Sequence, residues 1–270
     1  MTVQSETISA AELVAEQVRR LEAETRLVFP SQTHVVVRVD GKNFGAYTRN
    51  LDKPFDLGFV EAINATACAM VKEITGASMA YVQSDEISVI LSDLASAKTQ
   101  PYLAGVHSKV VSITAALATA NFNVAFAHAG KMPALFDSRA FPVSDREMVT
   151  AYLISRQTDA RRNALGMVCD AVLGKSVTMN KGTVERKEML REKGVEFDNF
   201  DKGLISGRVV VPQVTVEDVE FVNTRTGERE VAKQMSRKRW VVEDAPDFYL
   251  SATNLLDRCL PLEKGTTHAG

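Results

Sequence analysis

The sequence predicts an α+β fold in which helices pack on an antiparallel sheet. Two observations carry this expectation. The β-branched run 35–39 ends at Asp40 and a glycine-bearing turn, and such side chains are typical of a buried strand. The segment 79–91 holds apolar runs on both sides of Ser84-Asp85-Glu86, which predicts a β-hairpin with acidic residues at its tip. The acids are therefore expected at the ends of neighbouring strands.

Apolar residues at helical spacing predict helices between and beyond these strands. One helix is expected at about 57–75 and another at about 101–120, and further extended segments are expected at 123–128 and 140–143. The order over 33–128 is then strand, helix, hairpin, helix, strand. This is the βαββαβ order of a sheet with helices on one face, the palm architecture of polymerases and cyclases.

The remaining elements are helical and small β additions to this palm. An amphipathic helix is expected at 8–28 and is stopped by Pro30. The capping-box spacing of Ser144 and Glu147 predicts the start of a long helix over about 145–172.

After Gly174 the pattern changes to a charged helix at 183–193 and then to strands over 209–231 with a turn at 224–227. Few signals follow Trp240. We expect three parts: a palm catalytic domain with the N-terminal helix (1–143), a long helix with a helical, fingers-like region (144–206) and a β-rich C-terminal extension (207–270).

Composition and charge narrow the class of protein. The 270 residues suffice for one large domain or two small ones, and the formal net charge of −2 requires local basic patches to hold any RNA. The three cysteines lack Cys-x-x-Cys spacing, which favours a reducing compartment. The N-terminus has no apolar core like that of a signal peptide, and the weakly charged run 110–128 is too polar for a membrane span. We expect a cytoplasmic protein with no membrane partner.

Asp40, Asp85 and Glu86 are the candidate metal ligands, and Asp40 and Asp85 are the candidate catalytic residues. Carboxylates on adjacent strands can bridge two Mg²⁺ ions, and the carbonyl of Gly41 offers a further hard oxygen. One ion would activate an attacking hydroxyl and the other would hold a triphosphate. The alternative is that these acids are solvated turn residues.

The turn after the first acid is the candidate phosphate loop. Successive backbone N–H groups of Gly41-Lys42-Asn43-Phe44-Gly45 could wrap phosphates, and Lys53 could add a point charge. Glycine turns after strands are common, and most loop lysines are solvated, so both assignments stay open. Gly174-Lys175-Ser176 has the end of a Walker A motif, but Cys169 stands where the motif requires glycine, and we reject that assignment.

Arg156, Arg161 and Arg162 lie on the long predicted helix and could form a stripe for an RNA backbone. A solvated helix face with Asp159 paired locally explains the same charges. A second basic cluster is Arg237-Lys238-Arg239-Trp240, whose tryptophan could either stack on a base or pack inside the protein.

Sequence motifs that run in order from about residue 35 to 200 match one family: the acid-bearing segments 36–44 and 81–88, Lys53-Pro54 between them, Phe136-Asp137-Ser138-Arg139, the helical Tyr152–Asp159 segment, and Lys181-Gly182-Thr183 with Lys187-Glu188. Together they resemble the motifs of the tRNA-histidine guanylyltransferase-like proteins, which are 3′-to-5′ nucleotide polymerases. The tail beyond about residue 210 is not covered by this resemblance.

The resemblance implies a palm fold and a reaction at the 5′ end of tRNA. ATP would adenylylate a 5′-monophosphate, and the 3′-hydroxyl of an incoming GTP or other nucleotide would then attack the activated end and release AMP. With a 5′-triphosphate, pyrophosphate would leave instead. It also implies a homo-oligomer, because the family tends to tetramers.

Carried over by position, the resemblance assigns roles to individual residues. It places Asp40, Gly41 and Asp85 on two Mg²⁺ ions, and it places residues 42–45 with Lys53 and Ser84 on nucleotide phosphates. Asn163 would support the nucleotide, and Lys187 would join the helix arginines on RNA.

The long helix departs from the family pattern. Where the histidine-tRNA enzymes carry His-Ile-Asn-Asn-Leu-Tyr-Asn, residues 161–167 read Arg-Arg-Asn-Ala-Leu-Gly-Met, and Ser138 replaces a glycine. This departure favours the branch that adds nucleotides by template pairing and repairs truncated tRNAs. Guanylate addition to histidine tRNA, a palm-type nucleotidyl cyclase and a non-catalytic RNA-binding protein are the alternatives.

Overall fold

The computed structural model describes residues 10–126 and 132–261. Within these residues, six strands form one antiparallel sheet in the order β4-β1-β3-β2-β5-β6. Their bounds are β1 His34–Gly41, β2 Ala77–Gln83, β3 Glu86–Ser92, β4 Phe136–Val143, β5 Arg208–Val222 and β6 Arg229–Asp244. The helices are α1 Ala10–Glu24, α2 Phe44–Tyr47, α3 Leu57–Glu73, α4 His107–Ala125, α5 Arg146–Val172, α6 Thr183–Glu192, α7 Lys202–Ser206 and α8 Phe248–Cys259, and 3₁₀ turns lie at Tyr102–Gly105 and Phe197–Asn199.

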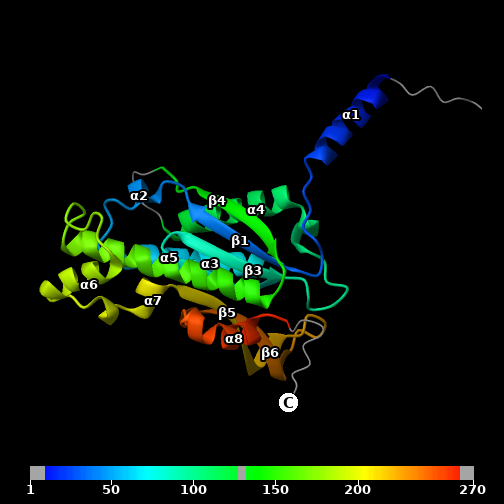
Figure 1. Cartoon of the computed structure of the whole chain (residues 1–270). Helices are drawn as coiled ribbons and strands as arrows, with labels where there is room; N and C mark the ends of the chain where they lie inside the picture. Colours follow the sequence, from blue (N-terminus) through cyan, green and yellow to red (C-terminus); the bar gives the residue numbers. More distant parts are fainter. Residues whose placement is uncertain (1–9, 127–131, 262–270) are drawn as a thin grey trace, which may run out of the picture.

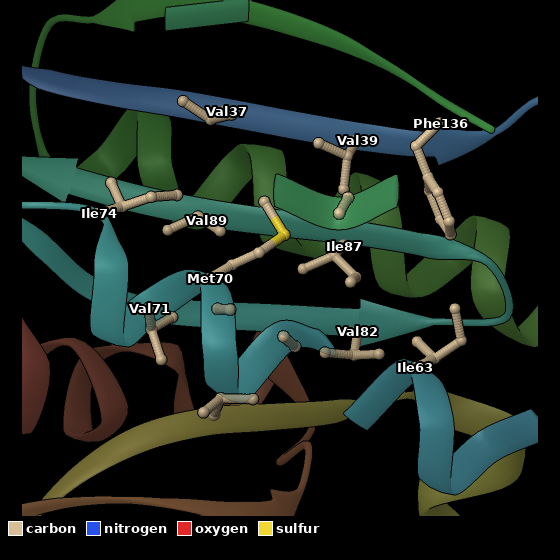
Figure 2. Packing of buried hydrophobic residues seen from close by; sticks show 14 of the residues in the cluster. Val37, Val39, Ile63, Met70, Val71, Ile74, Val82, Ile87, Val89 and Phe136 are labelled. Atoms are coloured by element: carbon tan, nitrogen blue, oxygen red, sulfur yellow. The ribbon is translucent and has the colours of Figure 1, made fainter. Parts of the chain in front are cut away.

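The chain order β1-α3-β2-β3-α4-β4 confirms the predicted βαββαβ arrangement (Figure 1). Helices α3 and α4 lie on one face of the sheet, where valine, isoleucine, methionine and phenylalanine side chains pack together (Figure 2). Val37, Val39, Ile87 and Val89 are completely buried there. Burial of this apolar face supplies the main driving force for folding.

The expectation of helices on one face alone was incomplete. Helices α5 and α8 cover the opposite face, where Val36, Ile90 and Val209 contact Leu153 and Phe248 in a second apolar cluster. Because alternate residues of a strand point to opposite faces, a strand that is apolar at successive positions must be covered on both sides. The valine run of β1 has this pattern.

Two local predictions were wrong. The expected strand at 123–128 is not formed, because Asn123–Ala125 complete helix α4; positions 127 and 128 lie outside the described residues. Asp145, rather than Ser144, caps α5 by accepting a hydrogen bond from the Met148 N–H.

The C-terminal region adds to the same sheet. Strand β5 pairs with β2 over Val209 and its two neighbours, and β5 and β6 then continue as a long two-stranded hairpin. Helix α8 was not predicted. It packs against α5 with a capped N-terminus at Asp247.

Helix α1 stands apart from the sheet and its covering helices (Figure 1). It is amphipathic, as predicted, but its apolar residues are exposed: Leu13, Val14, Val18 and Leu21. No helix among the described residues is long and apolar enough to cross a membrane.

Candidate active site

Two of the predicted acids meet at one end of the sheet. Strand β1 ends just after Asp40, and Asp85 lies in the two-residue turn between β2 and β3. The register pairs Val39 with Ile87, so the end of β1 lies beside this turn. The hairpin and the central strand therefore bring together side chains that are 45 positions apart in sequence.

The two carboxyl groups are electrostatically strained. Burial and then the negative charge of Asp40 raise the pKa of Asp85 to about 6. Burial, followed by the charges of Glu86 and Asp137, raises the pKa of Asp40. Crowded, partly desolvated carboxylates favour protonation or a bound cation, since either relieves the repulsion.

Asp137 is a third acid that the sequence reasoning left without a role. It lies on β4 directly opposite Asp40, and its side chain is about half exposed (55%). The signal was present in the Phe-Asp-Ser-Arg segment, but its meaning depended on the β1–β4 register. Among the described residues, no three His, Cys, Asp or Glu side chains are grouped closely enough to hold a metal ion by themselves.

Glu86 has a different partner. Both of its carboxylate oxygens accept hydrogen bonds from the Arg156 guanidinium, each at 2.8 Å, and Arg156 also contacts Asp159 at 2.6 Å. The Glu86 and Arg156 side chains are only 9% and 15% exposed. The structure therefore uses both residues in a buried ion pair that joins β3 to α5, whereas the sequence suggested a metal ligand and an RNA contact.

The turn after Asp40 is shaped by packing. A Cβ on Gly41 would lie 2.3 Å from the Phe44 ring, so only glycine allows this close approach. Phe44 is buried among other aromatic rings, and the N–H of Lys42 donates to Leu135 O at 2.8 Å. The side chain of Phe44 is thus part of the core, while Lys42, Asn43 and Gly45 are exposed.

Lys53 is held beside this turn. Its Nζ donates to Thr48 O at 2.9 Å, and the Lys53–Pro54 peptide bond is cis. The lysine is exposed, at the start of the loop that leads to α3. It therefore lies near the candidate phosphate loop, as expected from the sequence.

Two predicted nucleotide contacts line one pocket of about 50 Å³. Ser84, from the hairpin turn, and Asn163, from α5, border it together with residues of α3, α7 and β5. The pocket lies between the hairpin and α5.

The remaining predicted RNA contacts border a larger cleft of about 680 Å³ between α5, α6, α7 and the start of α8. Arg161 contacts Ser206 and Asp247, both at 3.1 Å, while Arg162 pairs with Asp159. Lys187 binds Asp198 and lies over the Phe197 ring. These three cations border the cleft together with Lys202, and each of the three is already close to an acidic side chain.

Comparison with known proteins connects this geometry to one family. The family model described as tRNAHis guanylyltransferase matches residues 15–144, which include Asp40 and Asp85. A solved bacterial tRNA(His) guanylyltransferase-like protein in complex with ATP is 26% identical, with a TM-score of 0.79, and the match covers 91% of this chain and 98% of that chain. Over residues 15–144 in sequence, and over most of its length in fold, this chain is similar to the tRNAHis guanylyltransferase family.

Two further proteins show the same similarity. A bacterial guanylyltransferase-like protein in complex with GTP has a TM-score of 0.68 at 25% identity, over 91% of this chain and 97% of that one. The tRNA(His) guanylyltransferase of Schizosaccharomyces pombe is 33% identical over 156 residues, which are 56% of this chain. The match spans 57% of the length of the Schizosaccharomyces pombe protein.

Proposed function

We propose that this protein is a metal-dependent 3′-to-5′ nucleotidyltransferase that activates a tRNA 5′ end with ATP and then adds nucleotides to it. The tRNA guanylyltransferases that it resembles are nucleotidyltransferases. The observation that carries the proposal is the meeting of Asp40 and Asp85, with raised pKa values, at the end of a βαββαβ sheet. In this proposal the sheet is a polymerase-type palm.

Mg²⁺ fits the site, because the donors are hard carboxylate oxygens whose mutual repulsion a cation would relieve. Asp40, Asp85 and the carbonyl of Gly41 would hold the metal ions. When bound, Mg²⁺ supplies charge neutralisation on the phosphates and activates a hydroxyl nucleophile. Glu86 would act indirectly, because its ion pair with Arg156 would hold the hairpin against α5.

The chain's own residues would bind and orient the substrates. The exposed backbone of the 41–45 turn and Lys53 would contact the triphosphate, and the pocket beside Ser84 and Asn163 would hold the base. Arg161, Arg162 and Lys187 would contact the RNA backbone in the larger cleft, after exchanging their acidic partners for phosphate.

We further propose that the added nucleotide is selected by template pairing, as in repair of 5′-truncated tRNA. This is supported by Arg161-Arg162-Asn163-Ala164-Leu165-Gly166-Met167 in place of the histidine-tRNA helix motif. In this proposal the protein works in the cytoplasm as a homo-oligomer, a tetramer by family resemblance. Its functional regions would be the three parts 1–143, 144–206 and 207–270.

The test uses a 5′-monophosphorylated tRNA that lacks its first nucleotide, with ATP, Mg²⁺ and each labelled nucleotide in turn. The base opposite the vacant position is varied, and Asp40→Ala is the control. Addition that follows the opposite base supports templated repair. Guanylate addition regardless of that base supports the histidine-tRNA alternative.

An absence of any addition by the wild-type protein contradicts the proposal. In that case, a cyclic nucleotide formed without RNA would point to a cyclase, and RNA binding unchanged by Asp40→Ala would point to a non-catalytic binding protein.

A further inference from the structure

Gln83, the last residue of β2, carries an unsatisfied buried polar group. The residue is 4% exposed, and its Oε1 has no hydrogen-bond partner among the residues the structure describes. Buried amide oxygens are nearly always paired, because desolvation without a compensating donor costs free energy. An unpaired amide oxygen beside a pocket indicates a group that can accept a hydrogen bond from a bound ligand.

A second buried glutamine in the same protein shows the usual situation. Gln157 is 3% exposed, and its amide nitrogen donates to Ser206 O at 3.3 Å and to Pro246 O at 2.7 Å. Its Oε1 accepts from Phe248 N at 3.0 Å. Gln157 therefore fastens α5 to the start of α8, whereas Gln83 has no comparable structural duty.

Gln83 borders the same pocket as Ser84 and Asn163. The pocket volume of about 50 Å³ leaves room for several waters, since one buried water needs roughly 10–15 Å³. Such a volume suits one planar ring system rather than a whole nucleotide. The sugar and phosphates of a bound nucleotide would lie outside, toward Asp85.

The walls of the pocket suit a flat aromatic group. Phe55, Phe59 and Met167 contribute apolar and aromatic surface, on which a base can stack. The other long polar side chain is already committed, because Arg208 donates to Asn64 at 2.7 Å and to Gly203 O at 2.8 Å. Gln83 is left as a buried acceptor for a ligand donor.

We propose that Gln83 reads the exocyclic amino group of the ATP base that occupies this pocket during the activation step; this rests on the proposed function. The carboxamide accepts from the amino group and can offer its own N–H to a neighbouring ring nitrogen, which is the two-point pairing that glutamine makes with adenine. Gln83 is then a specificity-determining residue for the activating nucleotide.

The first measurement needs no variant. Binding of ATP and of the triphosphate of purine riboside, which lacks the amino group, is compared by calorimetry in Mg²⁺ on the full-length protein. One neutral hydrogen bond to a buried acceptor predicts about tenfold tighter binding of ATP. Equal affinities would overturn the inference.

The second measurement uses Gln83→Met, an apolar side chain of similar length, with Gln157→Met as the matched control. Gln83→Met removes an unpaired buried oxygen, so the ligand-free protein should melt at the same or a higher temperature, while the preference for ATP over the analogue is lost. The KM for ATP in RNA adenylylation should rise about tenfold, with little change in kcat.

Gln157→Met should do the opposite. It breaks three satisfied hydrogen bonds, so the melting temperature should fall and the preference for ATP should stay. A Gln83→Met protein that melts lower and still prefers ATP would show that Gln83 has a structural role and would overturn the inference. Such a protein that still adds nucleotides leaves the proposed function intact. A wild-type protein that binds no ATP would contradict both the role of Gln83 and the proposed function.

Discussion

The two faces of strands β1 and β3 differ in character toward the end of the sheet. On the face toward α3 and α4, Val37, Val39, Ile87 and Val89 form a continuous apolar layer. On the face toward α5, the alternate positions Arg38, Asp40, Glu86 and Ser88 are polar, and Ser88 is bonded to Tyr152 of α5 at 2.7 Å.

One pair of strands thus serves two purposes through the two-residue periodicity of β-structure. The apolar face anchors the strands, and the opposite face keeps desolvated charges in place. The Nε of Arg38 is buried there without a partner among the described residues. Substitutions on the two faces should therefore separate activity from stability.

The largest effect on activity is expected from Asp40→Ala. Loss of one carboxylate that holds the metal ions should lower nucleotide addition by roughly 10³-fold or more, since metal-ion stabilisation contributes several kcal/mol to the transition state. The rate of labelled nucleotide addition measures this. The melting temperature should not fall, because the pKa of Asp40 is raised by burial and nearby acids. Asp137→Asn provides a neighbouring control; an equal loss of activity there would weaken the two-acid assignment.

Arg156→Leu should give the largest loss of stability. The substitution leaves the Glu86 carboxylate buried without its partner, which costs about 3–5 kcal/mol in comparable buried pairs. Denaturant unfolding measures the difference. The double variant Glu86→Gln with Arg156→Leu should regain part of the loss, because no unpaired charge remains. Additive losses in the two positions would indicate that the pair contributes no coupling energy.

Ile87→Ala tests the apolar face. Removal of this fully buried side chain should lower the free energy of unfolding by about 2–5 kcal/mol. The activity per folded molecule, measured well below the melting temperature, should change far less than in Asp40→Ala. A loss of activity equal to that of Asp40→Ala would mean that the two faces are not separable.

Asp85→Asn should change stability in a defined, pH-dependent way. The folded pKa of about 6 lies above the ordinary carboxyl value of 3.8, so the folded state binds more protons between these values. Stability of the wild-type protein should therefore fall as pH rises through this window, and the full penalty should be present above pH 6. In EDTA, the variant should melt higher than wild type at pH 7.5, with the difference vanishing below about pH 4. A lower melting temperature at pH 7.5 would contradict the cause of the shift.

The order of the palm elements along the chain could be predicted because its signals are local. The valine run ending at Asp40, the apolar runs around Ser84 and the helical spacing after position 56 are each read within a few residues. The end of α4 was mistaken for a strand for the same reason, since a short apolar run does not distinguish the two states by periodicity. The choice of Asp145 over Ser144 as the cap turns on a single residue.

The site could be predicted only in part. Asp40 and Asp85 were found because acids at the ends of adjacent strands must lie close together. The partner of Glu86 lies 70 positions away on α5, and its identity depends on how that helix packs. The environment of Gln83 likewise requires several separate segments to meet, and no sequence spacing records such a meeting.

The β5–β6 hairpin has a further consequence for local unfolding. Its base is held in the sheet by β2 around Val209, whereas its outer part is a ribbon of two strands with exposed side chains such as Val216 and Val222. An isolated two-stranded ribbon is only marginally stable in water. Amide hydrogens near the turn at Gly227 should therefore exchange with solvent long before those of Val209–Val211, although both belong to the same hairpin. The outer part of the hairpin is thus expected to unfold locally while the centre of the sheet stays folded.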